Sequence, residues 1–69
     1  MQPPKVREVI RLLERAGWIL VRVRGSHRQF HHPNRPGTVT VSGHLGDTMP
    51  RGTHQSVLRQ AGLRGGRPQ

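Results

Sequence analysis

A chain of 69 residues with twelve lysine and arginine residues against three acidic ones is one small domain with a formal net charge of +9. Because cysteine is absent, disulfide bridges and thiolate metal sites are excluded, and a reducing cytoplasm is the expected location. Eleven of the twelve basic residues are arginine, whose planar guanidinium suits phosphate, so the charge indicates a polyanionic partner such as nucleic acid.

The first predicted element is a helix that follows Pro3-Pro4 and ends at Gly17. Its apolar residues recur at spacings of three and four, which places them on one helical face: Val6, Val9, Ile10, Leu13 and Ala16. Residues 18–24 are rich in β-formers and predict a strand. The apolar run at its start is far too short to span a bilayer, so we expect no membrane association.

Two more strands and a second helix follow. A tight turn at Gly25-Ser26 leads into a strand over residues 27–32, and a turn at residues 33–37 leads into a strand over residues 38–41. Thr53 is the predicted N-cap of the last helix. Gly62 is its predicted end, with Leu63 folding back on the helix as in a Schellman motif.

The order α-β-β-β-α predicts an α+β fold with two helices on one face of a three-stranded antiparallel sheet. The domain should span residues 1–63, and residues 64–69 should form a disordered basic tail. Nine residues are expected to be buried: Val9, Ile10, Leu13, Val21, Phe30, Val39, Val41, Val57 and Leu58.

The Gly25-Ser26 turn also predicts a strand register. A two-residue turn pairs Arg24 with His27, and the pairs then run Val23–Arg28, Arg22–Gln29, Val21–Phe30, Leu20–His31 and Ile19–His32. Residues that share a face with Phe30 should meet the helices. Trp18 and Leu20 also fall on the other face, where the indole could stack on a base. This face then carries a basic, hydrogen-bonding surface formed by Arg22, Arg24, His27, Gln29 and His31.

His27 has the surroundings that phosphodiester cleavage needs. Cleavage without a metal requires a base for the 2′-hydroxyl proton, an acid for the leaving oxygen, and positive charge for the transition state. An imidazole beside Arg22 and Arg24 supplies these groups, and the small Gly25-Ser26 turn leaves room for a phosphate. The alternative is a strand histidine that only binds phosphate or is solvated. His31 and His44 are candidates for the second proton-transfer role, and strand alternation favours His31.

A metal site is a weaker interpretation of the same histidines. His27 and His31 share a strand face, and His44 or Asp47 could complete a coordination sphere, but no known metal-binding spacing is present. We therefore expect no metal and no cofactor.

Four segments together resemble the HicA toxins, also described as YcfA-like proteins, of bacterial HicAB toxin–antitoxin systems. The similarity covers about residues 4–63. Its most specific parts are Gly25-Ser26-His27 followed by Phe30, and Gly52-Thr53 leading to residues 60–63. The four segments read VIRLLERAGW, VRVRGSHRQFHHP, GTVTVSGHLGD and PRGTHQSVLRQAGL.

The resemblance implies a double-stranded-RNA-binding-domain-like fold and metal-independent cleavage of mRNA and other RNA. It implies that His27, of the Gly-Ser-His motif, is catalytic and that a HicB-type antitoxin covers it. The protein would then be an endoribonuclease (mRNA interferase), the toxin of a type II system in the bacterial cytoplasm, and a monomer when alone. The residues expected to contact RNA surround His27: Arg22, Arg24, Ser26, Arg28, Gln29 and His31.

Two positions depart from the family pattern. His54 stands where the family usually has an apolar residue, which makes the first turn of the second helix more polar. Ser42-Gly43 stands where many members have proline after the third strand. Neither departure touches His27.

Two other functions use the same residues. A non-catalytic RNA-binding module with this fold would read A-form shape through phosphate and 2′-hydroxyl contacts and would show no cleavage. A pure protein-interaction partner would use its basic face only to meet an acidic antitoxin, and would bind no RNA at physiological salt.

Overall fold

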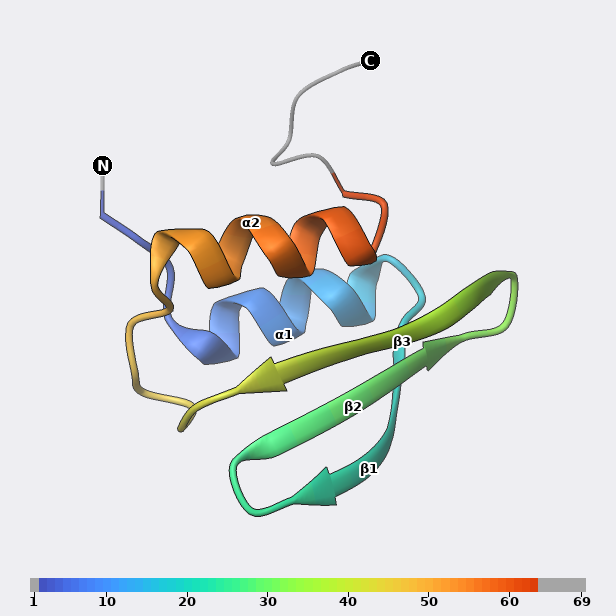
Figure 1. The fold of residues 1–69 in the computed structure, drawn as a ribbon, viewed down its shortest axis with the longest axis horizontal. Coiled ribbons are helices and arrows are strands. Elements are labelled where there is room, and N and C mark those ends of the chain that lie inside the picture. Colours follow the sequence, from blue (N-terminus) through green and yellow to red (C-terminus); the bar gives the residue numbers. More distant parts are fainter. Residues whose placement is uncertain (1, 64–69) are drawn as a thin grey trace.

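The computed structural model describes residues 2–63, so the predicted basic tail at 64–69 lies outside the described residues. Helix α1 (Val6–Arg15) is followed by strands β1 (Ile19–Arg24), β2 (His27–His32) and β3 (Arg35–Ser42), and then by helix α2 (Arg51–Gln60) (Figure 1). The predicted α-β-β-β-α order is confirmed. Each helix has ten residues, and no described helix is long and apolar enough to cross a membrane.

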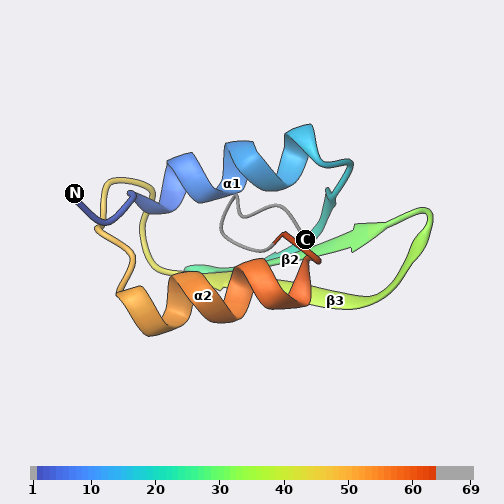
Figure 2. The same cartoon turned by 90° about the horizontal axis from the view of Figure 1, so that it is seen from above.

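The three strands form one antiparallel sheet in the order β1-β2-β3, so β2 is central and β1 and β3 are edges. The buried side chains of both helices join those of β2 and β3 in one cluster, which places the helices on one face of the sheet. Within this layer α2 runs beside β3, whereas β1 is the strand farthest from α2 (Figures 1 and 2).

The core confirms seven of the nine residues predicted to be buried and corrects two. Ile10 is only half-buried at the margin of the cluster, and Val21 is 50% exposed. Four further residues complete the buried set: Val6, Trp18, Met49 and Ala61. Met49 is held there by the loop before α2, where its backbone N–H donates to the Pro4 carbonyl at 2.8 Å.

A β-bulge in β1 explains the error at Val21. The predicted pairs Arg24–His27, Val23–Arg28 and Arg22–Gln29 are confirmed, but the register then shifts between Leu20 and Arg22. Leu20 therefore lies opposite Phe30, and Ile19 lies opposite His31. The predicted pairs Val21–Phe30, Leu20–His31 and Ile19–His32 are wrong, because the extra residue in the bulge moves every earlier residue one place along the partner strand.

Trp18 was expected on the open face of the sheet but is buried, with 2% of its surface exposed. Its position follows from the end of α1, where Gly17 adopts φ 97°. The N–H groups of Gly17 and Trp18 donate to the carbonyls of Glu14 and Leu13, which is the Schellman pattern. The residue after the glycine then packs back on the helix, so the indole enters the core.

Helix α2 ends with the same capping pattern as α1, but it begins at a different residue from the one predicted. The N–H groups of Gly62 and Leu63 donate to the carbonyls of Arg59 and Leu58, which confirms the predicted Schellman close. The helix begins at Arg51 with Pro50 as its N-cap, so Thr53 is not the cap. Strand β3 is also longer than predicted, because Arg35, Pro36 and Gly37 belong to the strand rather than to the preceding turn.

Candidate functional site

The face of the sheet that points away from the helices carries the predicted basic surface. Residues directly opposite in an antiparallel pair share a face. Arg24 lies opposite His27, and Arg22 lies opposite Gln29. His27 lies in turn opposite Ser42, and Gln29 opposite Thr40. The bulge does not disturb these pairs, because it lies on the other side of Arg22, away from the turn. The open face therefore brings together Arg22, Arg24, His27, Gln29 and His31.

His27 is exposed at the first position of β2, directly after the turn. Gly25 adopts φ 60°, as the first central residue of a type II′ turn requires, and the space that a side chain there would occupy is empty. A bulky anion can therefore approach His27 past the turn. The neighbouring guanidinium group of Arg24 lies on the same face.

The hairpin is fixed in place by two hydrogen bonds to Gly43, just past the end of β3. The Gly43 N–H donates to the Ser26 carbonyl at 3.1 Å, and Arg28 Nη1 donates to the Gly43 carbonyl at 3.0 Å. Arg28 is half-buried and, two residues from the buried Phe30, lies on the helix side of the sheet. It thus lies on the opposite face of the sheet from the other predicted RNA contacts, and its hydrogen bond joins β2 to the end of β3 beside the turn.

The two candidates for a second proton-transfer group lie at different ends of the site. His31 Nε2 lies 3.1 Å from Thr38 Oγ1, on the same face as His27. Four residues of strand separate the two histidines by about 13 Å, too far to act on one phosphodiester. His44 follows Gly43, so it lies next to the hairpin turn. Its N–H donates to Asp47 Oδ2 at 3.1 Å, and its side chain is exposed.

His32 has a structural environment, unlike the histidines of the open face. Its Nε2 lies 3.0 Å from the Ala16 carbonyl, and its Nδ1 accepts the Asn34 N–H at 3.0 Å. In the Nε2–H tautomer the ring donates to the Ala16 carbonyl and accepts the Asn34 N–H, so both ring nitrogens have a partner. The ring meets Trp18 edge-on at 5.2 Å between centroids, so it links the end of α1 to the turn between β2 and β3.

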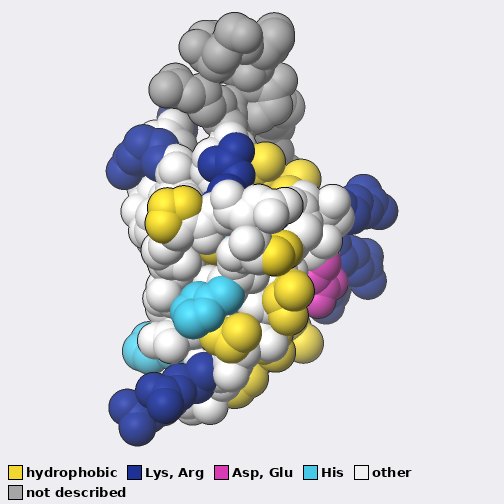
Figure 3. Space-filling model, turned by 90° about the vertical axis from the view of Figure 1, so that its right-hand side faces the viewer, with side chains coloured by type: hydrophobic (Ala, Val, Ile, Leu, Met, Phe, Trp, Pro, Cys, Tyr) yellow, Lys and Arg dark blue, Asp and Glu magenta, His cyan; other side chains and the backbone are white. Residues whose placement is uncertain are grey.

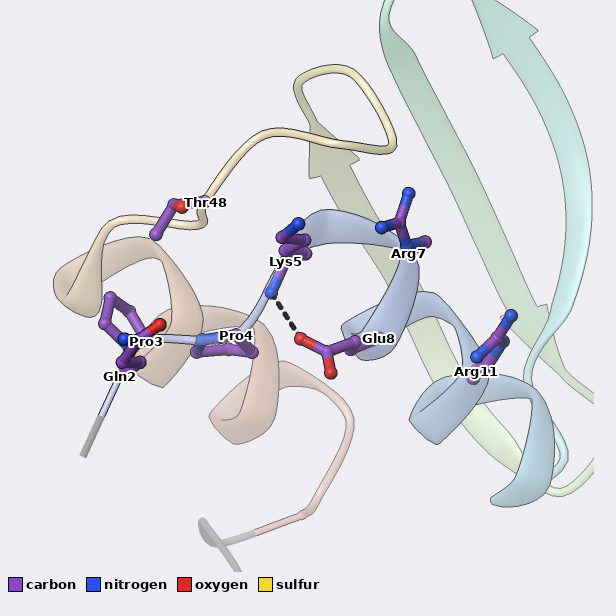
Figure 4. A pocket seen from close by; sticks show the side chains of 8 residues that line it. All are labelled: Gln2, Pro3, Pro4, Lys5, Arg7, Glu8, Arg11 and Thr48. Atoms are coloured by element: carbon purple, nitrogen blue, oxygen red, sulfur yellow. Dashed lines mark hydrogen bonds between the residues drawn. The ribbon is translucent and has the colours of Figure 1, made fainter.

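A second basic region lies at the start of α1. It is a shallow hollow in which Glu8 Oε1 accepts the Lys5 backbone N–H at 2.7 Å, and Arg7 and Arg11 project from one side of the helix (Figure 4). The hollow is lined by Gln2, Pro3, Pro4, Lys5, Arg7, Glu8, Arg11 and Thr48. Backbone bonds from Val6 and Arg7 to the loop at 45–47 place this end of α1 near the end of the sheet that carries His27.

Within residues 2–63, no group of three or more histidine and acidic side chains is arranged to hold a metal ion. His27, His31 and His44, which the sequence allowed as ligands, are distributed along the sheet and the loop rather than gathered at one point.

A comparison with protein families finds a match that covers nearly the whole domain. The model of the family described as HicA toxin of bacterial toxin–antitoxin matches residues 6–63, which includes both helices and all three strands. A comparison with curated protein sequences gives no significant match.

Proposed function

The chain belongs to the HicA family of toxins from bacterial toxin–antitoxin systems, and we propose that it acts as an endoribonuclease, an mRNA interferase of a type II system. The observation that carries the proposal is the position of His27. It is exposed beside an open glycine turn, and two arginines share its face of the sheet. RNA would lie across this face, with Gln29, His31 and the Ser26 turn as further contacts.

The proposed chemistry is transfer of the phosphodiester to the neighbouring 2′-oxygen. His27 Nε2 or Nδ1 takes the 2′-hydroxyl proton as that oxygen attacks phosphorus. The bond from phosphorus to the 5′-oxygen breaks, and a second group gives this oxygen a proton. The products are a 2′,3′-cyclic phosphate and a 5′-hydroxyl. Arg24, directly opposite His27, and Arg22 stabilise the negative charge of the transition state.

His44 is the proposed second proton-transfer group. The sequence favoured His31 because of its face, but the distance along β2 favours His44. The hydrogen bond from the Gly43 N–H to the Ser26 carbonyl brings the start of the loop that carries His44 against the turn beside His27. No reaction step in this scheme uses a metal or cofactor.

The test of this function compares RNA with DNA of the same sequence in the presence of excess EDTA. We expect single-turnover cleavage of single-stranded RNA and none of the DNA, because DNA lacks the 2′-hydroxyl nucleophile. Products are resolved on denaturing gels and their ends identified by mass spectrometry. If the RNA stays intact in EDTA and is cut when Mg²⁺ is supplied, the metal-independent mechanism is wrong. Binding without cleavage under either condition would indicate the non-catalytic RNA-binding module.

RNA affinity should depend on Arg22 and Arg24 to the same degree whatever the RNA sequence. We expect the double variant Arg22→Glu/Arg24→Glu to weaken binding of unrelated RNAs at least tenfold and about equally, because phosphate contacts carry no sequence information. The slope of log affinity against log salt should fall by roughly 1.4 for single strands, about 0.7 per lost contact. Fluorescence anisotropy across a salt series measures both quantities.

The matched control for that measurement is Arg51→Glu/Arg59→Glu on α2, which makes the same change in net charge away from the open face. An equal loss of affinity and slope in the control would show that net charge alone binds RNA. Unchanged binding in the sheet variant would move the interface to the α1 hollow with Lys5, Arg7 and Arg11.

Membership of a toxin–antitoxin family implies an antitoxin partner. We take this partner to be a HicB-type antitoxin that covers the face around His27, and we take the free toxin to be a monomer in the bacterial cytoplasm. The basic open face favours an antitoxin with an acidic surface, because acidic side chains of the antitoxin would compete with RNA phosphates for the same guanidinium groups.

A further inference from the structure

Gln29 occupies the middle of the open face of the sheet. It lies on the central strand β2, with Arg22 opposite it on β1 and Thr40 opposite it on β3. His27 and His31 stand on the same face, two residues away along β2 in either direction. Figure 3 shows histidine and basic side chains close together on the lower part of the molecule, where Figure 1 places β1 and β2. Strand side chains stand roughly perpendicular to the sheet, so Gln29 projects from the centre of the surface across which RNA is proposed to lie.

The side-chain amide of Gln29 is free and accessible. It makes no hydrogen bond within residues 2–63. Gln29 is half-buried, yet Trp18 Nε1 is the only side-chain nitrogen or oxygen of the described residues that is buried without a partner. The amide of Gln29 is therefore open to solvent, and the half-burial falls on its aliphatic stem, between the side chains of the two neighbouring strands. Such an amide is held at its base and available at its tip.

The other side chains of the open face select poorly among bases. Its arginines suit phosphate, and phosphate contacts carry no sequence information. Thr38 Oγ1 lies 3.1 Å from His31 Nε2, so these two groups already have a partner. The exposed hydroxyl of Thr40 can donate or accept, and it therefore fits either kind of base edge. Gln29 differs from all of these because its amide presents a donor and an acceptor side by side.

An amide of this kind matches adenine in two ways. Glutamine pairs with adenine through the 6-amino group and N7, a recurrent bidentate contact. The Watson–Crick edge is also open in single-stranded RNA, and there the 6-amino group stands beside N1, again a donor beside an acceptor. On its outer edge guanine presents two acceptors, N7 and O6, and the pyrimidines have no ring nitrogen there. Adenine is therefore the base that a glutamine amide can hold through either edge.

The spacing along β2 places this base beside the scissile phosphate. Two residues of strand separate Gln29 from His27 by about 7 Å. This separation is comparable to the length of one nucleotide in an extended single strand. When His27 is at the 2′-hydroxyl next to the scissile phosphate, the amide of Gln29 is thus within reach of a base that flanks this phosphate.

We propose that Gln29 selects adenine at a nucleotide that flanks the scissile phosphate, through a bidentate hydrogen bond to the 6-amino group and the adjacent ring nitrogen. This assignment rests on the proposed function, because it concerns the same RNA surface. It adds a sequence-selective contact to the sequence-independent contacts of Arg22 and Arg24. Gln29 takes no part in the proton transfers.

Binding measurements test the selection separately from cleavage. Seven-nucleotide oligouridines with a central adenine, guanine, cytosine or uracil are 2′-O-methylated throughout to prevent cleavage, and fluorescence anisotropy measures their affinity for the full-length protein. We expect the adenine oligonucleotide to bind at least about fivefold more tightly than the other three, the discrimination that one bidentate pair provides. An oligonucleotide with central purine riboside, which lacks the 6-amino group, should bind no more tightly than the guanine one.

The variant Gln29→Met keeps the length of the side chain and removes the amide. We expect its preference for adenine to fall to within twofold, while its affinity for oligouridine stays within twofold of that of the unchanged protein. Thr40→Val is the matched control, because it removes the neighbouring polar group from the same face, and it should retain the preference. Circular dichroism checks that both variants are folded.

A preference for adenine that persists in Gln29→Met would overturn the inference, because stacking rather than the amide would then select the base. Equal affinity for all four oligonucleotides, no RNA binding, or an equal loss of preference in Thr40→Val would also overturn it. Cleavage of an RNA pool with all four bases at every position separates this inference from the proposed function. Cuts without enrichment of adenine next to the cut contradict the selection alone, whereas an intact preference in binding without any cuts contradicts the nuclease alone.

Discussion

Replacement of His27 by alanine should reduce RNA cleavage by a factor of about 10² to 10⁴, the range that a positioned acid–base group contributes. It should also abolish growth inhibition when the toxin is expressed. The side chain of His27 is exposed and makes no hydrogen bond within residues 2–63, so its removal leaves no buried group unsatisfied. Single-turnover cleavage rates, circular dichroism and RNA affinity measured on the same preparations separate chemistry from folding and binding.

His31→Ala is the matched control for this variant. It removes an imidazole from the same strand and the same face, and it takes away one exposed contact to Thr38. Because His31 lies about 13 Å along the strand from His27, we expect cleavage to fall less than tenfold. The loss of cleavage in His44→Ala should lie between the losses in His27→Ala and His31→Ala. Full activity of His27→Ala on RNA, or equal losses in His27→Ala and His31→Ala, would show that His27 is not the base.

Replacement of Phe30 by alanine should unfold the domain or bring it close to unfolding. Phe30 is fully buried at the centre of β2, where it packs in the cluster that joins both helices to the sheet. Removing a buried Phe side chain costs about 3–5 kcal/mol of folding free energy, and a chain of this size has roughly 3–10 kcal/mol in total. Urea denaturation followed by the fluorescence of Trp18, the one tryptophan, measures the loss.

Val21→Ala is the comparison for the Phe30 variant. The sequence placed Val21 opposite Phe30 in the core, whereas the structure leaves it half-exposed in the bulge. We expect Val21→Ala to cost less than about 1 kcal/mol. A loss at Val21 as large as that at Phe30 would support the unbulged register, and a stable Phe30→Ala protein would contradict the core described above.

Local sequence signals predicted most of the fold, and the largest error concerns Trp18. A glycine followed by an apolar residue predicts a Schellman close at Gly62-Leu63, and the structure confirms it. Gly17-Trp18 is the same signal at the end of α1, and it would have placed Trp18 in the core rather than on the open face.

The register error at Val21 had no comparable signal. The turn at Gly25-Ser26 fixes the pairs nearest to it, because its geometry determines the first pair. A bulge farther along the strand depends on how the sheet twists under the helices, and alternation alone does not reveal it. The same limit applies to the site. Alternation predicted the shared face of His27, Arg22 and Arg24, but the position of Arg28 against Gly43 depends on a contact fifteen residues away along the chain.

The central claim is that a 2′-oxygen of the substrate attacks phosphorus with His27 as its base. A short RNA with a mapped cleavage site, in which only the 2′-oxygen next to the scissile phosphate is methylated, tests it most directly. With excess EDTA, we predict that the unmodified RNA yields a 2′,3′-cyclic phosphate by mass spectrometry and that the methylated RNA stays intact at this one site. Cleavage at the methylated site would contradict the account, because it would require an activated water as the nucleophile.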